Sequence, residues 1–227
     1  MSEFDRVSES YDEEIDLGLS LTGEDKSYYA YGRIAWLASK LKKYGFQPRT
    51  AMDFGCGTGA SSPILADMLN LERVAGIDIS PKCLEVARRE HDRQGLTYCH
   101  PDEFHTNQDI DLAYCNGVFH HIPGEQRGEA LQYIRQGLRP GGMLALWENN
   151  PYNPAVRWIM KKVPFDRDAV MLWPGECREM ISGAGFRVLE TSYLFIFPRW
   201  LGALRRTEPW FSRLPLGGQY MVLALKN

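Results

Sequence analysis

The chain has 227 residues, of which 44% are hydrophobic and 24% are charged, as in an ordinary globular domain. Its 26 basic and 29 acidic residues give a net charge of −3, so the composition offers no general basic field for nucleic acid. No apolar run approaches the roughly 20 residues of a membrane span, and the polar, acidic start at Met1–Asp5 is unlike a signal peptide.

The five cysteines are odd in number and show no Cys-x-x-Cys spacing. This pattern argues against a disulfide framework and against a zinc site, so we expect no metal. Unpaired thiols are typical of a reducing compartment, and we therefore expect a cytoplasmic protein.

Strands and helices alternate along most of the chain. The sequence leaves open whether the acidic residues 1–25 form a short helix or a mobile flap, and helical spacing of apolar residues then predicts a helix over 27–44, ended by Gly45. The predicted strands are, in order, 51–54, 74–77, 96–99, 110–115, 143–147, 187–197 and 219–225. The predicted helices between them are 64–69, 81–87, 125–138 and 176–182. This alternation predicts an α/β fold with a parallel, doubly wound sheet.

A glycine-rich turn follows the first predicted strand. Asp53 ends that strand, and Gly55, Gly57 and Gly59 follow at alternate positions before a helix begins. Glycine permits a positive φ and lets a ligand lie against bare backbone, and a helix amino terminus attracts a carboxylate or phosphate. Asp78 ends the next strand, where an acid can accept both hydroxyls of a ribose.

The identity of the ligand depends on the acid before the glycines. An acid there would repel the diphosphate of a dinucleotide and suits a ligand that carries a cationic amine. The glycine spacing by itself does not exclude a dinucleotide fold, because Ala60 stands where the Gly-x-Gly-x-x-Gly pattern takes Gly or Ala.

With its acid-x-Gly-x-Gly-x-Gly motif at Asp53–Gly59, the chain resembles the class I S-adenosylmethionine-dependent methyltransferases of the small-molecule type. The resemblance covers residues 50–185 firmly and the last strands more loosely. It implies a Rossmann-like sheet of seven strands in the order 3-2-1-4-5-7-6, with the last strand antiparallel. It also implies S-adenosylmethionine as cofactor and S-adenosylhomocysteine as product.

The length of the chain predicts one domain over residues 1–227. Residues 1–45 would form an amino-terminal helical cap, 46–148 the cofactor-binding core, and 149–227 the substrate-side insertions and last strands.

Cofactor-binding residues follow from the resemblance, strand end by strand end. Asp53 would face the cofactor amine, Asp78 the ribose and Ile79 the adenine. Asp102, with its neighbour Glu103, would accept from the adenine amino group, although Pro101 replaces the family's usual Gly here. The remaining expected cofactor contacts are Gly55, Cys56, Gly57, Gly59, Asn116 and, as a cover, Tyr11.

Three side chains are candidates for a general base. His120 and His121 follow the fourth strand in a segment, 116–123, that resembles the same segment of small-molecule methyltransferases, and Glu148 ends the fifth strand. A base is needed if the acceptor is a hydroxyl or an ammonium group.

The insertions 149–173 and 195–216 are rich in aromatic residues, and in the second insertion arginines lie between them. The sequence leaves three interpretations open: rings that cover the sheet, a roofed pocket for an apolar, aromatic or anionic acceptor, or a surface that touches lipid. Tyr11, Tyr28, Tyr29 and Tyr31 are expected to close such a pocket from the other side. The aromatic residues are Tyr152, Trp158, Phe165, Trp173, Phe197, Trp200, Trp210 and Phe211, and the arginines are Arg199, Arg205, Arg206 and Arg213.

We therefore predict methyl transfer to a small molecule, with oxygen favoured over nitrogen, and no nucleic-acid partner. Membrane contact is not favoured, and the oligomeric state is left open. The alternatives are an NAD(P)-dependent oxidoreductase and a non-catalytic protein that binds a cofactor or a partner. A methyltransferase for RNA or protein is a further one, against which the net charge weighs.

Overall fold

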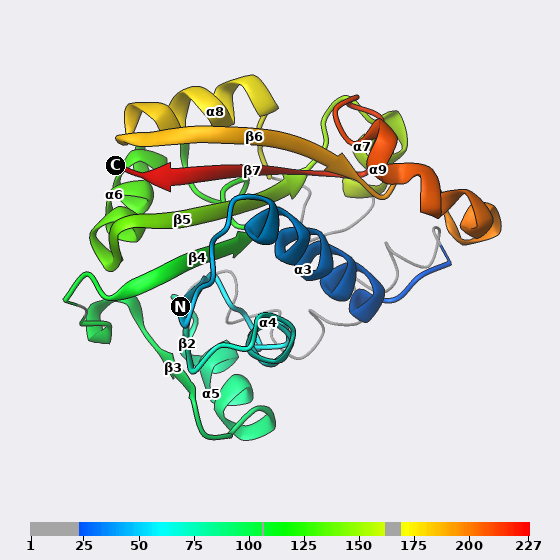
Figure 1. The fold of residues 1–227 in the computed structure, drawn as a ribbon. Helices are drawn as coiled ribbons and strands as arrows, with labels where there is room; N and C mark the ends of the chain where they lie inside the picture. The colour runs from blue at the N-terminus through cyan, green and yellow to red at the C-terminus, as the bar shows by residue number, and fades with distance from the viewer. Residues whose placement is uncertain (1–22, 106, 162–168) are drawn as a thin grey trace.

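The computed structural model describes residues 23–105, 107–161 and 169–227, and Figure 1 shows their arrangement. One sheet of seven strands has the order β3-β2-β1-β4-β5-β7-β6. The first five strands pair in parallel, and β7 runs antiparallel to both β5 and β6. The predicted doubly wound sheet and its strand order are confirmed. The strands are β1 Thr50–Phe54, β2 Arg73–Ile77, β3 Leu96–Cys99, β4 Ile110–Asn116, β5 Leu138–Asn149, β6 Phe186–Leu194 and β7 Gln219–Lys226.

Helices cover both faces of the sheet (Figure 1). Successive side chains of a strand point to opposite faces of the sheet, and both faces are buried. In β4, Leu112 joins the core under α3 and α4, whereas Ala113 joins the core under α6 and α8. Two large apolar cores thus hold the layers together, and a smaller cluster of Leu84, Ala87 and Tyr98 packs α5 on β3. The helices are α3 Lys26–Lys43, α4 Ser61–Leu69, α5 Pro81–Glu90, α6 Arg127–Gly137, α7 Pro154–Met160, α8 Pro174–Gly183 and α9 Glu208–Phe211, and the 3-10 turns are η1 Pro101–Glu103, η2 Gly124–Gln126 and η4 Arg199–Thr207.

Several predicted boundaries differ from the structure by a few residues, and three of these differences are the following. The helix expected over 125–138 is the η2 turn followed by α6, and β5 begins at Leu138 instead of residue 143. The third difference is β6, which ends at Leu194 and not at 197, because Phe195 has a φ of +64°. The carboxylate of Glu208 accepts the N–H groups of residues 195, 196 and 197, each at 3.1 Å, which takes these donors out of the sheet.

Local sequence signals explain where several elements begin. Ser80 caps α5 by accepting the Cys83 N–H, and Pro81 occupies the first helical position. Asp25 caps α3 in the same way, by accepting the Tyr28 N–H at 2.7 Å. In the described ranges no helix is long and apolar enough to cross a bilayer.

Candidate active site

A cavity of about 720 Å³ lies at the carboxyl ends of the parallel strands β1 and β4. Its walls are the glycine turn after β1, the amino-terminal half of α3, the helix α7, and the segment 195–200 that follows β6. Ligands bind at this edge in open α/β sheets, and the volume lies within the range of about 300–1,000 Å³ that is typical of small-molecule pockets.

The glycine turn presents bare backbone to this cavity. Gly55 has a φ of +73°, and a Cβ on it would lie 2.2 Å from Cγ2 of Val118, so a side chain does not fit. Gly57 has a φ of +54°, yet a Cβ on it would meet no atom within 4 Å. Since Gly57 lines the cavity, the open space beside it is a cradle that a bound group can fill.

Asp78 fixes this turn from behind. Its carboxylate accepts the Gly57 N–H at 2.8 Å and the Ser80 N–H at 2.9 Å. Burial raises the pKa of Asp78, and these backbone hydrogen bonds oppose that shift by favouring the ionised form. The turn and the end of β2 are thereby held as one unit.

Asp53 places an acid directly in the cavity wall. The side chain is buried, and it accepts a hydrogen bond from the Ser62 hydroxyl at 2.7 Å. Burial raises the pKa of Asp53 to about 7, while the Ser62 hydrogen bond and the nearby Arg33 guanidinium oppose this rise. A cationic ligand group beside Asp53 would stabilise the ionised carboxylate further.

His120 and Glu148 form a buried pair at the ends of β4 and β5. Nδ1 of His120 lies 2.5 Å from Oε2 of Glu148, and Oε1 of Glu148 accepts the Phe119 N–H at 2.8 Å. An ionised carboxylate only accepts hydrogen bonds, so Nδ1 of His120 donates to Oε2 of Glu148. His121 packs against His120, with ring centroids 4.1 Å apart, and both histidines line the cavity.

The predicted residues divide into those that line the cavity and those that do not. Asp78 and Glu148 support lining residues from behind, and Gly59 packs against Ala87 and Tyr98. Ile79, Asp102 and Glu103 lie outside the cavity, and Tyr11 falls outside the described residues. The predicted residues that line it are Asp53, Gly55, Cys56, Gly57, Asn116, His120 and His121.

The edge beyond the cavity holds the predicted adenine contacts. The side chain of Asp102 is 90% exposed, and Oδ2 lies 3.3 Å from Nδ1 of His100. Ile79 is exposed at the end of β2. Ile79, Asp102 and Glu103 do not line the cavity, and their roles in binding adenine stay predictions.

Arg33 is a cavity residue that the sequence analysis does not predict. It lies on α3 and is buried, with Nε donating to the Tyr114 hydroxyl and Nη1 to Oε1 of Gln219, both at 3.1 Å. A signal was present, because Arg33 interrupts the apolar stripe of Ala30, Ile34 and Leu37. A cation on the buried stripe of a helix needs a partner, and here it meets the cavity.

Rings and cations form the wall opposite the glycine turn. Aromatic side chains line the cavity, in agreement with the interpretation of a roofed pocket. They are Tyr28, Tyr29, Trp158, Phe197 and Trp200. Tyr152 and Trp173 instead pack on each other at 5.0 Å, and Phe165 falls outside the described residues.

Cations outnumber acids on this cavity surface. The described residues that line it include Lys26, Arg33 and Arg205, against Asp53 as the single acid. Arg205 stacks over the Tyr28 ring at 4.5 Å and forms an ion pair with Glu24 at 2.8 Å. The wall therefore combines aromatic surface with positive charge.

Comparisons with known proteins agree with this geometry. Residues 52–144 match a family described as a methyltransferase domain. A trans-aconitate 2-methyltransferase from Rhodopseudomonas palustris is 28% identical over 119 residues, which are 52% of this chain and 46% of that protein. The chain thus matches about half the length of this curated relative.

Solved structures share the fold. A chain from the Haloferax volcanii complex between the Trm112 methyltransferase activator and a methyltransferase has a TM-score of 0.66 at 19% identity, over 99% of this chain and 98% of that chain. Magnesium protoporphyrin IX methyltransferase from Synechocystis PCC 6803, solved with bound SAH, has a TM-score of 0.59 at 17% identity, over 87% of this chain and 83% of that chain.

Proposed function

We propose that this chain, which carries a class I S-adenosylmethionine-dependent methyltransferase domain with the family match at residues 52–144, methylates a small molecule held in the cavity described above. The observation that carries the proposal is the continuity of this cavity. One cavity is lined by the glycine turn on one side and by aromatic and cationic side chains on the other. A methyl donor and an acceptor bound there would be neighbours, as a direct transfer requires.

The turn residues fit the methionine end of the cofactor. The open space at Gly57 would hold the methionine part of the cofactor. Asp53 would attract its ammonium group, and Arg33 would attract its carboxylate. Asp78, which borders the turn outside the cavity lining, would accept the ribose hydroxyls of a cofactor that extends past the cavity, while keeping its bonds to the turn. When bound, S-adenosylmethionine supplies an electrophilic methyl group on its sulfonium.

The chain's own contribution to the reaction is to position the acceptor and to take up a proton. Glu148 holds the His120 ring through Nδ1, so Nε2 is the ring atom that can accept a proton from an acceptor hydroxyl. His121 packs on the same ring and limits its rotation. Methylation at oxygen is accordingly the reaction that this pair supports best.

The cations in the cavity wall favour an anionic acceptor with an apolar or aromatic body. Lys26 and Arg205, whose Nη1 also pairs with Glu24, supply positive charge, and Tyr29, Phe197 and Trp158 supply apolar surface. The curated relative named for trans-aconitate supports a carboxylate-bearing acceptor. If the carboxylate itself accepts the methyl group, no proton needs to be removed, and His120 would then serve in positioning.

Calorimetric titration tests the cofactor part of the proposal. S-adenosylmethionine and S-adenosylhomocysteine should bind to the wild type, and Asp78→Asn should weaken both. Asp92→Asn, an exposed acid after α5, is the matched control and should bind like the wild type. Binding of NAD(P) instead of these ligands, in a folded protein, would favour the oxidoreductase alternative.

Mass spectrometry tests the acceptor part. The protein is incubated with S-adenosylmethionine and a panel of aromatic and aliphatic hydroxy acids and carboxylic acids, and methylated products are sought. Loss of turnover in His120→Asn for a hydroxyl acceptor would support proton transfer. Equal turnover of the wild type and this variant would contradict a base role for His120.

A further inference from the structure

The segment after β6 carries an exposed surface that lies outside the cavity except at Trp200. We call it the Trp–Arg face and define it by Trp200, Leu204, Arg206, Trp210, Phe211 and Arg213. Trp200 is 79% exposed and Trp210 is 81% exposed. Indole rings this exposed are unusual on a monomeric protein and mark interaction sites when they gather with other apolar side chains.

The face is held in place without burying these rings. Glu208, itself buried, accepts three backbone N–H groups from residues 195–197. The Tyr193 N–H donates to the Ser212 carbonyl at 2.7 Å, and Arg205 Nε donates to the Phe197 carbonyl at 3.1 Å. The scaffold is thus fixed by polar contacts, and the rings are displayed on it.

The charge of this face opposes the charge of the whole chain. Between residues 195 and 217 the only acidic residue is Glu208, whose carboxylate is turned inward onto backbone N–H groups. Arg199, Arg206 and Arg213 are exposed in the same segment. A positive, ring-bearing face therefore lies on a chain of net charge −3.

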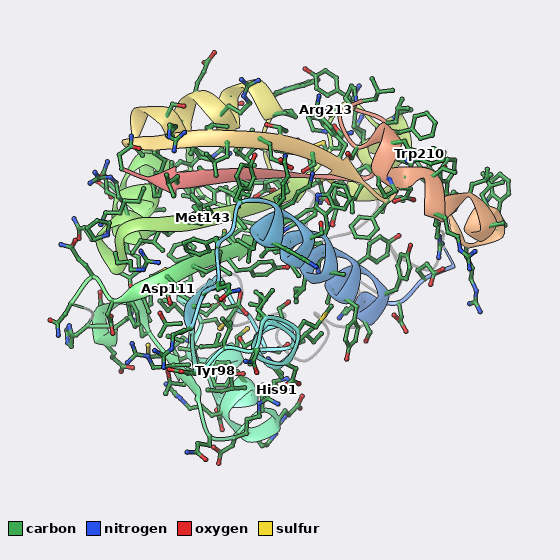
Figure 2. The ribbon with its side chains drawn as sticks, in the orientation of Figure 1. His91, Tyr98, Asp111, Met143, Trp210 and Arg213 are labelled. Atoms are coloured by element: carbon green, nitrogen blue, oxygen red, sulfur yellow. The ribbon has the colours of Figure 1, made fainter. Side chains whose placement is uncertain are left out.

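The shape and position of the segment favour a flat partner. In Figure 1 the η4 and α9 segment projects from one end of the sheet, and Figure 2 labels Trp210 and Arg213 at the same end of the molecule. A projecting segment with exposed indoles and guanidinium groups suits a surface whose headgroups are anionic and whose interior is apolar. Tryptophan is favoured at the headgroup level of bilayers, and arginine pairs with lipid phosphate.

We propose that the Trp–Arg face docks this protein on an anionic phospholipid bilayer. The rings of Trp200 and Trp210 enter the headgroup region while Arg206 and Arg213 meet lipid phosphates. Trp200 also lines the cavity, so the docked surface reaches the cavity rim. This binding goes beyond the proposed methyl transfer and does not depend on it.

Co-sedimentation with sucrose-loaded vesicles tests the proposal. The full chain is mixed with vesicles of phosphatidylcholine alone and of phosphatidylcholine with phosphatidylglycerol, at low salt and at about 0.15 M salt. Binding is expected for the anionic vesicles and should weaken as salt screens the arginines. Arg206→Gln with Arg213→Gln should lower the partition coefficient by roughly tenfold to thirtyfold, and Trp210→Ser should lower it severalfold.

A matched double variant separates this face from net charge. Arg89→Gln with Arg187→Gln makes the same change in net charge on α5 and at the far end of β6, and it should bind vesicles like the wild type. Melting temperature should be unchanged in all the variants because the substituted residues are exposed, and S-adenosylmethionine affinity should be unchanged because none of them lines the cavity.

Four results would overturn the proposal. These are no binding to anionic vesicles at low salt, equal binding to vesicles of phosphatidylcholine alone, an equal loss in the control double variant, and a dimer in solution that Trp210→Ser dissociates. The last would assign the face to a second copy of the chain.

Discussion

The buried acid at Asp53 makes cofactor binding dependent on pH in a defined direction. Its pKa stands at about 7 because of burial, whereas the ammonium group of the proposed cofactor would bind the ionised form. Affinity should therefore rise with pH up to about 7 and level off above it. With one titrating group, the ionised fraction changes roughly eightfold between pH 6 and pH 7.5, and the affinity should follow it.

The same linkage predicts proton release. At pH 7 about half of the Asp53 carboxyls carry a proton, so binding should release about half a proton per cofactor. Calorimetry in two buffers of different ionisation enthalpy measures this number directly. The titration of the wild type is repeated from pH 6 to pH 7.5.

Two variants make the assignment specific to Asp53. Asp53→Asn removes the titrating group and should give weaker binding that no longer varies over this range. Ser62→Ala removes the hydroxyl that favours the ionised form, and should raise the midpoint by about one to two pKa units, as expected for a hydrogen bond to a charged group. A wild-type affinity that is flat from pH 6 to pH 7.5, or a midpoint that Ser62→Ala leaves unchanged, would refute the reasoning.

Three further predictions rest on single contacts. Glu148→Gln removes the carboxylate at His120 Nδ1 and, for a hydroxyl acceptor, should lower kcat about tenfold or more and alter its pH profile, while an unchanged profile would contradict the pairing. Gly55→Ala should lower the free energy of unfolding by about 2–4 kcal/mol through positive φ and the clash with Val118, and Val118→Ala should restore part of the loss in urea titrations. Glu208→Ala leaves three backbone donors unpaired and should cost about 2–3 kcal/mol by the same measurement, where a loss below about 0.5 kcal/mol would argue against its anchoring role.

Local patterns in the sequence were sufficient to predict the strands of the sheet and the residues on one side of the cavity. The strands of a sheet buried on both faces appear as apolar runs, and the polar residues at their carboxyl ends meet at one edge. Asp53, Gly57 and His120 were found in this way, and each lines the cavity. The order of the strands came from the resemblance to a known family.

Contacts between distant segments determined the position of Arg33 and the end of β6. Arg33 lies near Asp53 because α3 packs over the end of β1. No local pattern around position 33 predicts that proximity. The end of β6 depends on Glu208, which stands 14 residues beyond Leu194 and takes up the N–H groups that would otherwise extend the strand.

The aromatic insertions illustrate the same division. Their composition predicted rings near the acceptor side, but it did not distinguish Trp158, which lines the cavity, from Trp173, which packs on Tyr152. Periodicity records which side of its own element a residue occupies. Which ring meets the cavity depends on how separate elements pack together, and that choice is made by long-range contacts that only the folded chain contains.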